Sequence, residues 1–246
     1  MKKIAVISDI HGNIIALEKV VQNFEQRNVD LVVNLGDHLS GPLWPKETLE
    51  YLKQQTWIQI RGNHERQLIT QNPEELGQSD LYAYQKLNND DLDWLRALSP
   101  FVEIDKEISI FHGSPTNDMT YLLETIENGR ARLATQDEVA ERLCGTKSPV
   151  ILCGHTHIPR VIETKEGQLI VNPGSVGLPA YDDINPEPHV METGSPHARY
   201  AIIEKTDNQW KVELITILYN YQKAAEQALR NNRNDWKIGL QTGYMK

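Results

Sequence analysis

The sequence predicts an α/β protein whose first half is a parallel half-domain. Apolar runs typical of buried strands alternate there with segments of helical periodicity, and this alternation within about sixty residues indicates βαβ units. The expected elements are strands at 4–7, 31–35 and 57–60 and helices at 14–24 and 46–54. The 246 residues suffice for a sizeable core, and we expect one domain over the whole chain, 1–246, because no repeat or linker interrupts it.

Each of these first elements has a local reason. The β-branched and apolar residues of 4–7 suit a strand that is buried on both faces. Asn13 is placed to cap the first helix, in which apolar residues recur at helical spacing from Ile14 to Phe24. Pro45 occupies the first turn of the second helix, where its missing N–H costs no hydrogen bond.

The remainder of the chain is more polar and carries further strands. We expect one helix over 81–98, a mostly helical stretch over 117–143 that is a candidate cap, and a long surface loop over 179–196, which is rich in Pro, Asp, Asn and Gly. One or both of the last two segments should border the site, because loops supply the walls that select a substrate. Strands are expected at 108–111 and 150–153, hairpins at 161–171 and 200–217, and a C-terminal helix at 220–230.

The charge balance excludes some classes of function. The chain has 25 Lys and Arg against 34 Asp and Glu, a net charge of −9, which argues against binding along a nucleic-acid polymer. A small phosphorylated substrate remains compatible, because a bound cation reverses the local field. No segment resembles a membrane span, and Cys144 and Cys153 are too few for a disulfide scaffold. We therefore expect a cytoplasmic protein with no membrane partner.

Side chains able to bind metal or phosphate follow five of the expected strands. Ligands gather outside the carboxyl ends of the strands in open α/β sheets. One such cluster would be weak evidence, but five at one edge would be costly to bury without a metal. The mixed nitrogen and oxygen donors favour Mn, Fe, Zn or Co over Ca. The clusters are Asp9-Ile10-His11-Gly12, Gly36-Asp37, Gly62-Asn63-His64-Glu65, His112-Gly113 and Gly154-His155-Thr156-His157.

In their order and spacing, these clusters resemble the calcineurin-like metallophosphoesterases, in the small bacterial phosphodiesterase and phosphatase branch. The segment Asn172-Pro173-Gly174-Ser175-Val176-Gly177 is also similar to that branch. The resemblance implies a four-layer α/β/β/α sandwich and two divalent transition-metal ions, with Mn preferred. It assigns Asp9, His11, Asp37 and His157 to one ion, and Asp37, Asn63, His112 and His155 to the other. Asp37 would bridge the pair.

The resemblance also implies an activity. A metal-bridging hydroxide would attack the phosphorus of a small phosphodiester, phosphomonoester or nucleotide, and a diester or dinucleoside polyphosphate is preferred within that range. His64 has no metal assigned; beside Asn63 it would bind the phosphate or donate a proton to the leaving oxygen, unless it is a structural imidazole. Arg66 and Arg160 are further candidates for phosphate contacts, although solvated arginines are the simpler interpretation.

Two alternatives stay open, a Ser/Thr phosphoprotein phosphatase and a non-catalytic scaffold on the same fold. Protein phosphatases share the block at 61–65, but their second block reads G-D-x-V-D-R-G, and here Ser40 and Gly41 replace the Asp and Arg. Those two residues pair with the catalytic His and grip phosphate. A scaffold would be expected to lose metal ligands or His64, and none is missing. The substrate, the native metal and the oligomeric state stay open.

Overall fold

The first sheet confirms the predicted parallel half-domain. The computed structural model describes residues 2–207 and 209–246. Asn13 caps helix α1 by accepting a hydrogen bond from the backbone N–H of Ala16 (3.3 Å). β1, β2 and β3 run parallel, and β13 and β14 add the predicted antiparallel hairpin to the other side of β1. In spatial order the strands are β14 (Gln209–Ile217), β13 (Ala198–Thr206), β1 (Lys2–Ile7), β2 (Leu31–Asn34) and β3 (Ile58–Gln59).

A second sheet packs face to face against the first. Its three inner strands, β5, β8 and β10, are parallel, and β9 and β10 form the hairpin expected over 161–171. Apolar side chains of both sheets, such as Ile4 and Val33 from the first and Ile110 and Leu152 from the second, fill the space between them. The order is β4 (Phe101–Ile104), β5 (Ile108–Phe111), β8 (Val150–Leu152), β10 (Leu169–Asn172) and β9 (Arg160–Glu163).

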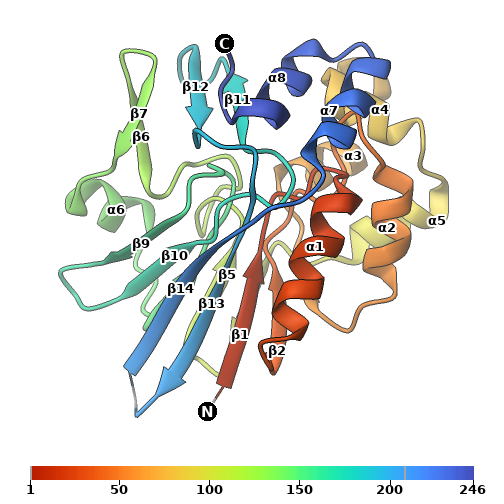
Figure 1. Cartoon of the computed structure of the whole chain (residues 1–246). Helices are drawn as coiled ribbons and strands as arrows, with labels where there is room; N and C mark the ends of the chain where they lie inside the picture. Colours follow the sequence, from red (N-terminus) through yellow and green to blue (C-terminus); the bar gives the residue numbers. More distant parts are fainter. Residues whose placement is uncertain (1, 208) are drawn as a thin grey trace.

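Helices cover the outer faces of both sheets and complete the four-layer α/β/β/α arrangement (Figure 1). On the first sheet these are α1 (Ile14–Glu25), α2 (Pro45–Lys53), α7 (Tyr221–Arg230) and α8 (Asn234–Thr242). The second sheet is covered by one short helix, α6 (Gln136–Arg142), and the segment before it. The helices α3 (Asn63–Thr70), α4 (Gln78–Tyr84) and α5 (Asn89–Ala97), with the short 3₁₀ turn Pro73–Glu75, pack on one another beside β3.

The expectation of a mostly helical segment at 117–143 is wrong. Strands β6 (Glu124–Glu127) and β7 (Arg130–Leu133) form an antiparallel hairpin there, and only α6 is helical. The turn consists of Asn128 and Gly129, both with positive φ (54° and 73°). Asn-Gly is the preferred dipeptide for a two-residue hairpin turn, and this local signal outweighs the helical periodicity around it.

The expectation of a long surface loop at 179–196 is also wrong. Strands β11 (Ala180–Asp183) and β12 (His189–Glu192) pair antiparallel, and β12 continues onto β7 to give a third sheet, β11-β12-β7-β6. The residues that suggested a loop are concentrated in the connection at 184–188. The strands pair with each other at four positions, and Val190 of β12 also pairs with Arg130 of β7, which lies sixty residues away in the sequence.

Three smaller differences follow from local caps and tertiary contacts. The predicted helix at 81–98 is divided into α4 and α5, because Asn88 caps the second helix by accepting from the N–H of Asp91. Strand β4 and helix α8 were not expected; both are short and their apolar residues face neighbouring elements. Among residues 2–207 and 209–246, no helix has the length and apolar character needed to cross a membrane.

The stability of the protein should depend strongly on how the apolar side chains between the two large sheets pack. Ile110→Ala, at a fully buried position, should lower the free energy of unfolding by about 2–5 kcal/mol, because it leaves a cavity. Leu133→Ala, at a position 47% exposed on β7, should change it by about 0.5 kcal/mol or less. Urea unfolding followed by circular dichroism measures both, and equal effects would contradict this description of the core.

Candidate metal centre and active site

The predicted ligands converge because parallel strands from both large sheets end at the same side of the molecule. Ligand-bearing loops follow strands β1, β2, β5 and β8, and α3 starts where β3 has ended. The loops after β1 and β2 run together, since the N–H groups of Asp9 and His11 donate to the carbonyls of Gly36 and Asp37. The converging residues are Asp9, His11, Asp37, Asn63, His64, His112, His155 and His157.

Five of these residues have an unusual backbone conformation. Asp9, His11, Asp37, His155 and His157 all have positive φ, between 51° and 68°. For residues other than glycine, this left-handed conformation costs roughly 1–2 kcal/mol each. Such strain is typical of functional sites, where the surrounding structure holds it in place. Here it turns each loop sharply after its strand and directs the side chains toward a common centre.

A buried carboxylate, Glu65, fixes the loop that carries Asp37. Its two oxygens accept hydrogen bonds from the backbone N–H groups of Asp37 (2.8 Å), His38 (2.8 Å) and Gly62 (2.9 Å). The N–H of His64, at the start of α3, donates to Asp37 Oδ1 (3.1 Å). A side chain at Gly62 would collide with that oxygen, since its Cβ would lie 2.2 Å away. The Asp37 carboxylate is therefore held from two directions.

Three of the imidazoles are held by main-chain carbonyl groups in the same way. A carbonyl oxygen can only accept a hydrogen bond, so each Nδ1 carries a proton. In the neutral ring, Nε2 then presents a lone pair to the centre, which is the arrangement of a histidine that binds metal. The Nδ1···O distances are 2.7 Å in each of the pairs His11–Ser40, His112–Leu35 and His157–Leu178.

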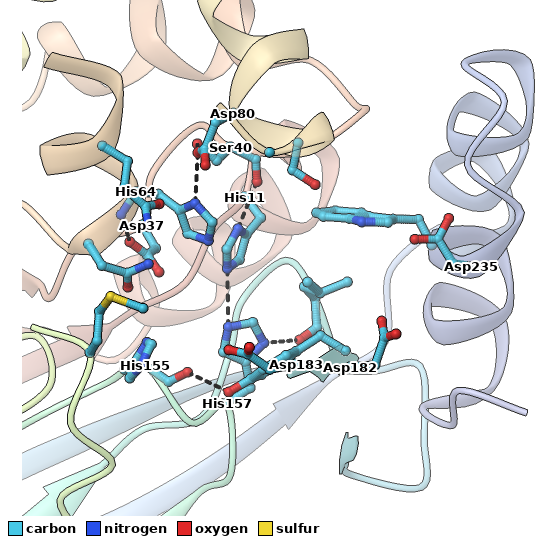
Figure 2. Close-up of a pocket in the computed structure, with 18 of the residues that line it drawn as sticks. His11, Asp37, Ser40, His64, Asp80, His155, His157, Asp182, Asp183 and Asp235 are labelled. Atoms are coloured by element: carbon cyan, nitrogen blue, oxygen red, sulfur yellow. Dashed lines mark hydrogen bonds and ion pairs between the residues drawn. The ribbon is translucent and has the colours of Figure 1, made fainter. Parts of the chain in front are cut away.

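The donor atoms form two groups that match the two predicted ion sites. Asp9, His11 and His157 make one group and Asp37, His112 and His155 the other, with donor atoms within 4.8 Å of one another in each. Asp37 also lies within that distance of His11 and His64, so it stands between the groups. Figure 2 shows His11 and His157 facing each other, with their Nε2 atoms 3.1 Å apart.

Buried atoms without hydrogen-bond partners show that the residues fit metal ions. Asp9 Oδ1 and Asn63 Oδ1 are both buried, and neither has a hydrogen-bond partner among the described residues. Leaving such atoms unpaired is costly, and a cation removes that cost. The set combines imidazole nitrogen with carboxylate and amide oxygen, which suits Mn, Fe, Zn or Co.

The protein groups alone shift one another's protonation strongly. Burial and the neighbouring His157 lower the pKa of His11 to about 3, and burial with His112 lowers that of His155 to about 4. Burial opposes protonation of His112 as well, but the carboxylates of Asp37 and Asp9 outweigh it and raise its pKa to about 9. Metal binding needs neutral imidazoles, so His11 and His155 are ready to bind, whereas His112 would release a proton when an ion binds.

His64 has a partner that the sequence did not reveal. Its Nδ1 lies 2.7 Å from Asp80 Oδ1 on helix α4, and the Ser40 hydroxyl donates to the same oxygen (2.5 Å). Although burial opposes it, Asp80 together with Asp37 raises the pKa of His64 to about 10. No sequence signal links Asp80 to His64, because the contact depends on how α4 packs against α3 (Figure 2).

The centre opens into a cavity of about 550 Å³, which we call the catalytic cavity. Its walls include Met119, Asp183 and the C-terminal residues Arg233 and Trp236. Both segments that were expected to border the site, 117–143 and 179–196, thus contribute residues to these walls, although both are built differently from the prediction. Helix α8 adds a wall that the sequence did not predict, and the Trp236 ring packs edge-on against His11.

The two candidate arginines are engaged elsewhere. Arg66 donates two hydrogen bonds to the Asp118 carboxylate (2.6 and 2.8 Å), and Arg160 donates to Glu124 (2.5 Å). Neither is among the described residues that line the catalytic cavity. Contact between these arginines and a substrate stays a prediction.

Comparison with known proteins agrees with this geometry. The family model of the calcineurin-like phosphoesterase superfamily domain matches residues 1–194. The chain belongs to the calcineurin-like phosphoesterase superfamily. Its members depend on metal ions, and the buried Asp and His groups are able to hold them. The number and identity of the ions in this superfamily member stay predictions.

Related proteins share the fold over most of the chain. A curated relative, an uncharacterized protein of Methanocaldococcus jannaschii, is 26% identical over 260 residues and covers 95% of this chain and 94% of its own. The crystal structure of a metallophosphoesterase from Sphaerobacter thermophilus has a TM-score of 0.76, with 24% identity and 99% of both chains covered. A structure provisionally described as a diadenosine tetraphosphatase has a TM-score of 0.54, with 17% identity, covering 88% of this chain and 94% of its own.

Metal content is the first property of this superfamily member to measure. We expect about two transition-metal ions per chain after reloading with Mn, and loss of metal in Asp37→Ala, because no other carboxylate stands between the two groups. Asp182→Ala, in the wall of the same cavity, should keep the wild-type content. Elemental analysis after gel filtration measures all three. A content near zero in the reloaded wild type would contradict the metal centre.

The Asp80 contact predicts the titration of His64. In chelator-treated protein His64 should stay protonated to about pH 10, and Asp80→Asn should lower its pKa by about one unit or more, because a carboxylate favours the imidazolium. Because the folded pKa is raised, the stabilisation from this pair is full below pH 6.5 and is lost as the pH rises through about 10. NMR of the imidazole protons measures the pKa of His64 in the wild type and in Asp80→Asn. Asp182→Asn is the control, and an unshifted His64 in Asp80→Asn would refute the assignment.

Proposed function

We propose that the protein is a phosphoesterase that uses two divalent transition-metal ions to hydrolyse a small phosphodiester, phosphomonoester or nucleotide in the cytoplasm. The observation that carries this proposal is the pair of donor groups with Asp37 between them. Asp9, His11 and His157 would hold one ion, and His112, His155 and Asn63 the other. Mn is our preferred metal for both positions.

The geometry of the site suggests separate roles for the ions, for His64 and for Asn63. When bound, two ions lower the pKa of a shared water and stabilise charge on the phosphate oxygens. His64 is oriented by Asp80 through Nδ1, which leaves Nε2 to donate a proton to the leaving oxygen. Cations beside His64 would lower its raised pKa toward neutrality, where a general acid is most effective. Asn63, at the start of α3, would position the phosphate next to His64.

A Ser/Thr phosphoprotein phosphatase remains the second candidate, with one observation in its favour. Asp80 supplies from α4 the carboxylate that the motif around Ser40 lacks. The missing arginine is not restored in the same way. Arg233 lines the cavity, but its guanidinium is engaged by Asp235 and Ser79. A protein serine/threonine phosphatase of Saccharomyces cerevisiae, 16% identical over 89% of this chain and 81% of its own with a TM-score of 0.51, shares the fold alone.

A non-catalytic scaffold agrees less well with the site. A scaffold gains nothing from two buried oxygens without hydrogen bonds, Asp9 Oδ1 and Asn63 Oδ1. It also has no use for His64 held between a carboxylate and an open cavity. These features are costly to stability and are explained by catalysis.

Leaving-group dependence tests the proposed function. His64→Ala should keep its metal but lower turnover of alkyl or nucleoside esters by roughly 10²–10⁴-fold, because an alkoxide needs a proton to leave. Turnover of p-nitrophenyl esters should fall less, since that oxygen leaves unaided. Steady-state kinetics at full Mn loading gives both values.

A neighbouring substitution provides the control for that test. Gln67→Ala lies on the same helix and lines the same cavity, so it should affect the two ester classes alike. An equal loss on both classes in His64→Ala would mean that His64 positions the phosphate. Absence of turnover for every ester and metal in the wild type would refute the enzyme and favour the scaffold.

A further inference from the structure

A second cavity lies next to the metal centre. It has a volume of about 390 Å³ and lies over the β6–β7 hairpin, so we call it the hairpin cavity. It shares four lining residues with the catalytic cavity, namely Met119, His155, Asp183 and Asn185. Since His155 is a predicted metal ligand, a group bound in the hairpin cavity would adjoin the phosphate at the metals.

The walls of the hairpin cavity are largely apolar and firmly held. Met119, Tyr121, Ile126 and Pro186 line it. The Tyr121 ring lies against the His155 ring, with centroids 5.0 Å apart. The Tyr121 hydroxyl is fixed by hydrogen bonds, because it donates to His189 Nε2 (3.0 Å) and accepts from the Tyr181 hydroxyl (3.1 Å). A preformed, mostly apolar cavity of this kind suits an organic group.

The charges around the hairpin cavity disfavour an anion. Arg142 is the cationic side chain among the described residues that line it, and both terminal nitrogens of its guanidinium already donate hydrogen bonds within the protein. It donates to the carbonyls of Tyr121, Leu122 and Glu124 and to the Thr125 hydroxyl. The other charged groups lining the cavity are the carboxyl groups of Glu124 and Asp183. A phosphate or carboxylate there would face two carboxyl groups and one guanidinium whose terminal nitrogens are already hydrogen-bonded.

Glu124 gives the hairpin cavity a preference for hydrogen-bond donors. Its side chain is 1% exposed, and Arg160 binds Oε1. The other oxygen, Oε2, is buried without a partner in hydrogen-bonding geometry. Burial raises the pKa of the Glu124 carboxyl, although the hydrogen bonds from Arg160 and Thr156 oppose that shift. A hydroxyl donor on a bound group would satisfy an oxygen of this kind.

We propose that the hairpin cavity binds the retained arm of a phosphodiester, and that this arm is uncharged and bears hydroxyl groups, as a nucleoside does. The inference rests on the proposed function. His64 lines the catalytic cavity and is absent from the described residues of the hairpin cavity, so the leaving arm lies on the His64 side.

The reaction that follows has a defined product. Water adds its oxygen to phosphorus and releases one proton, the bond from phosphorus to the leaving oxygen breaks, and that oxygen takes a proton from His64. The released proton replaces the one that His64 gave, so the net reaction is hydrolysis. The retained arm stays esterified, so the product is its phosphomonoester. A retained arm that carries a further phosphate is disfavoured, so a dinucleoside polyphosphate would be attacked at the phosphorus next to one nucleoside, with the polyphosphate arm leaving.

Filling the hairpin cavity tests this assignment with one leaving group. In Ile126→Trp, kcat/KM for the p-nitrophenyl ester of thymidine 5′-phosphate should fall about tenfold or more, because the indole occupies the nucleoside position. The value for p-nitrophenyl phosphate, which has no second arm, should change less than about twofold. Leu133→Trp, on the same hairpin but exposed, should change neither. Equal losses on both esters in Ile126→Trp, or no loss, would overturn the proposal.

A binding measurement separates this proposal from the proposed function. Calorimetry on the Mn-loaded protein with a hydrolysis-resistant dinucleoside phosphorothioate should show about tenfold weaker binding in Ile126→Trp, with wild-type affinity in Leu133→Trp. If the wild type hydrolyses neither ester, the proposed function fails, and this titration still decides the cavity. Unchanged affinity in Ile126→Trp would refute the assignment. Cleavage of diadenosine tetraphosphate into two ADP, which retains a phosphorylated and therefore charged arm, would refute the uncharged arm.

Discussion

Two imidazole nitrogens that face each other are the constraint on which the site depends. His11 Nε2 and His157 Nε2 lie 3.1 Å apart, and each ring already gives its Nδ1 proton to a main-chain carbonyl. Two lone pairs at this distance repel unless a cation binds both. Because the carbonyls of Ser40 and Leu178 fix the rings, they cannot turn away without losing those hydrogen bonds. The fold thus holds an arrangement that is stable only with positive charge at its centre.

The main chain maintains this arrangement at a cost. Five positions that carry predicted ligands have a left-handed backbone. The buried Glu65 carboxylate accepts hydrogen bonds from three backbone N–H groups of neighbouring loops. The two packed sheets supply the rigidity that makes this strain sustainable, since their apolar strands end directly beneath the loops. Stability is therefore concentrated between the sheets, and the strained, polar residues are collected at one end.

The two cavities beside the predicted metal centre differ in the polarity and charge of the residues that line them. The catalytic cavity contains His64 with Asp80 and suits the departing oxygen. The hairpin cavity has mostly apolar walls, and the Arg142 guanidinium that lines it is already hydrogen-bonded, which is why we propose a neutral group there. Positive charge for a phosphate is then concentrated at the metal positions. This distribution reconciles a protein of net charge −9 with a phosphorylated substrate.

The sequence by itself determined which residues gather at one edge and could hold metal, because Asp9, His11, Asp37 and the other predicted ligands directly follow buried strands whose apolar character is a local signal. It also determined the order of the first strands and helices. The tertiary structure alone decided the walls: β12 pairs with β7, and Asp80 reaches His64 because α4 packs against α3. Ligand positions depend on where each strand ends, whereas walls and proton partners depend on contacts between distant segments, which no local pattern records.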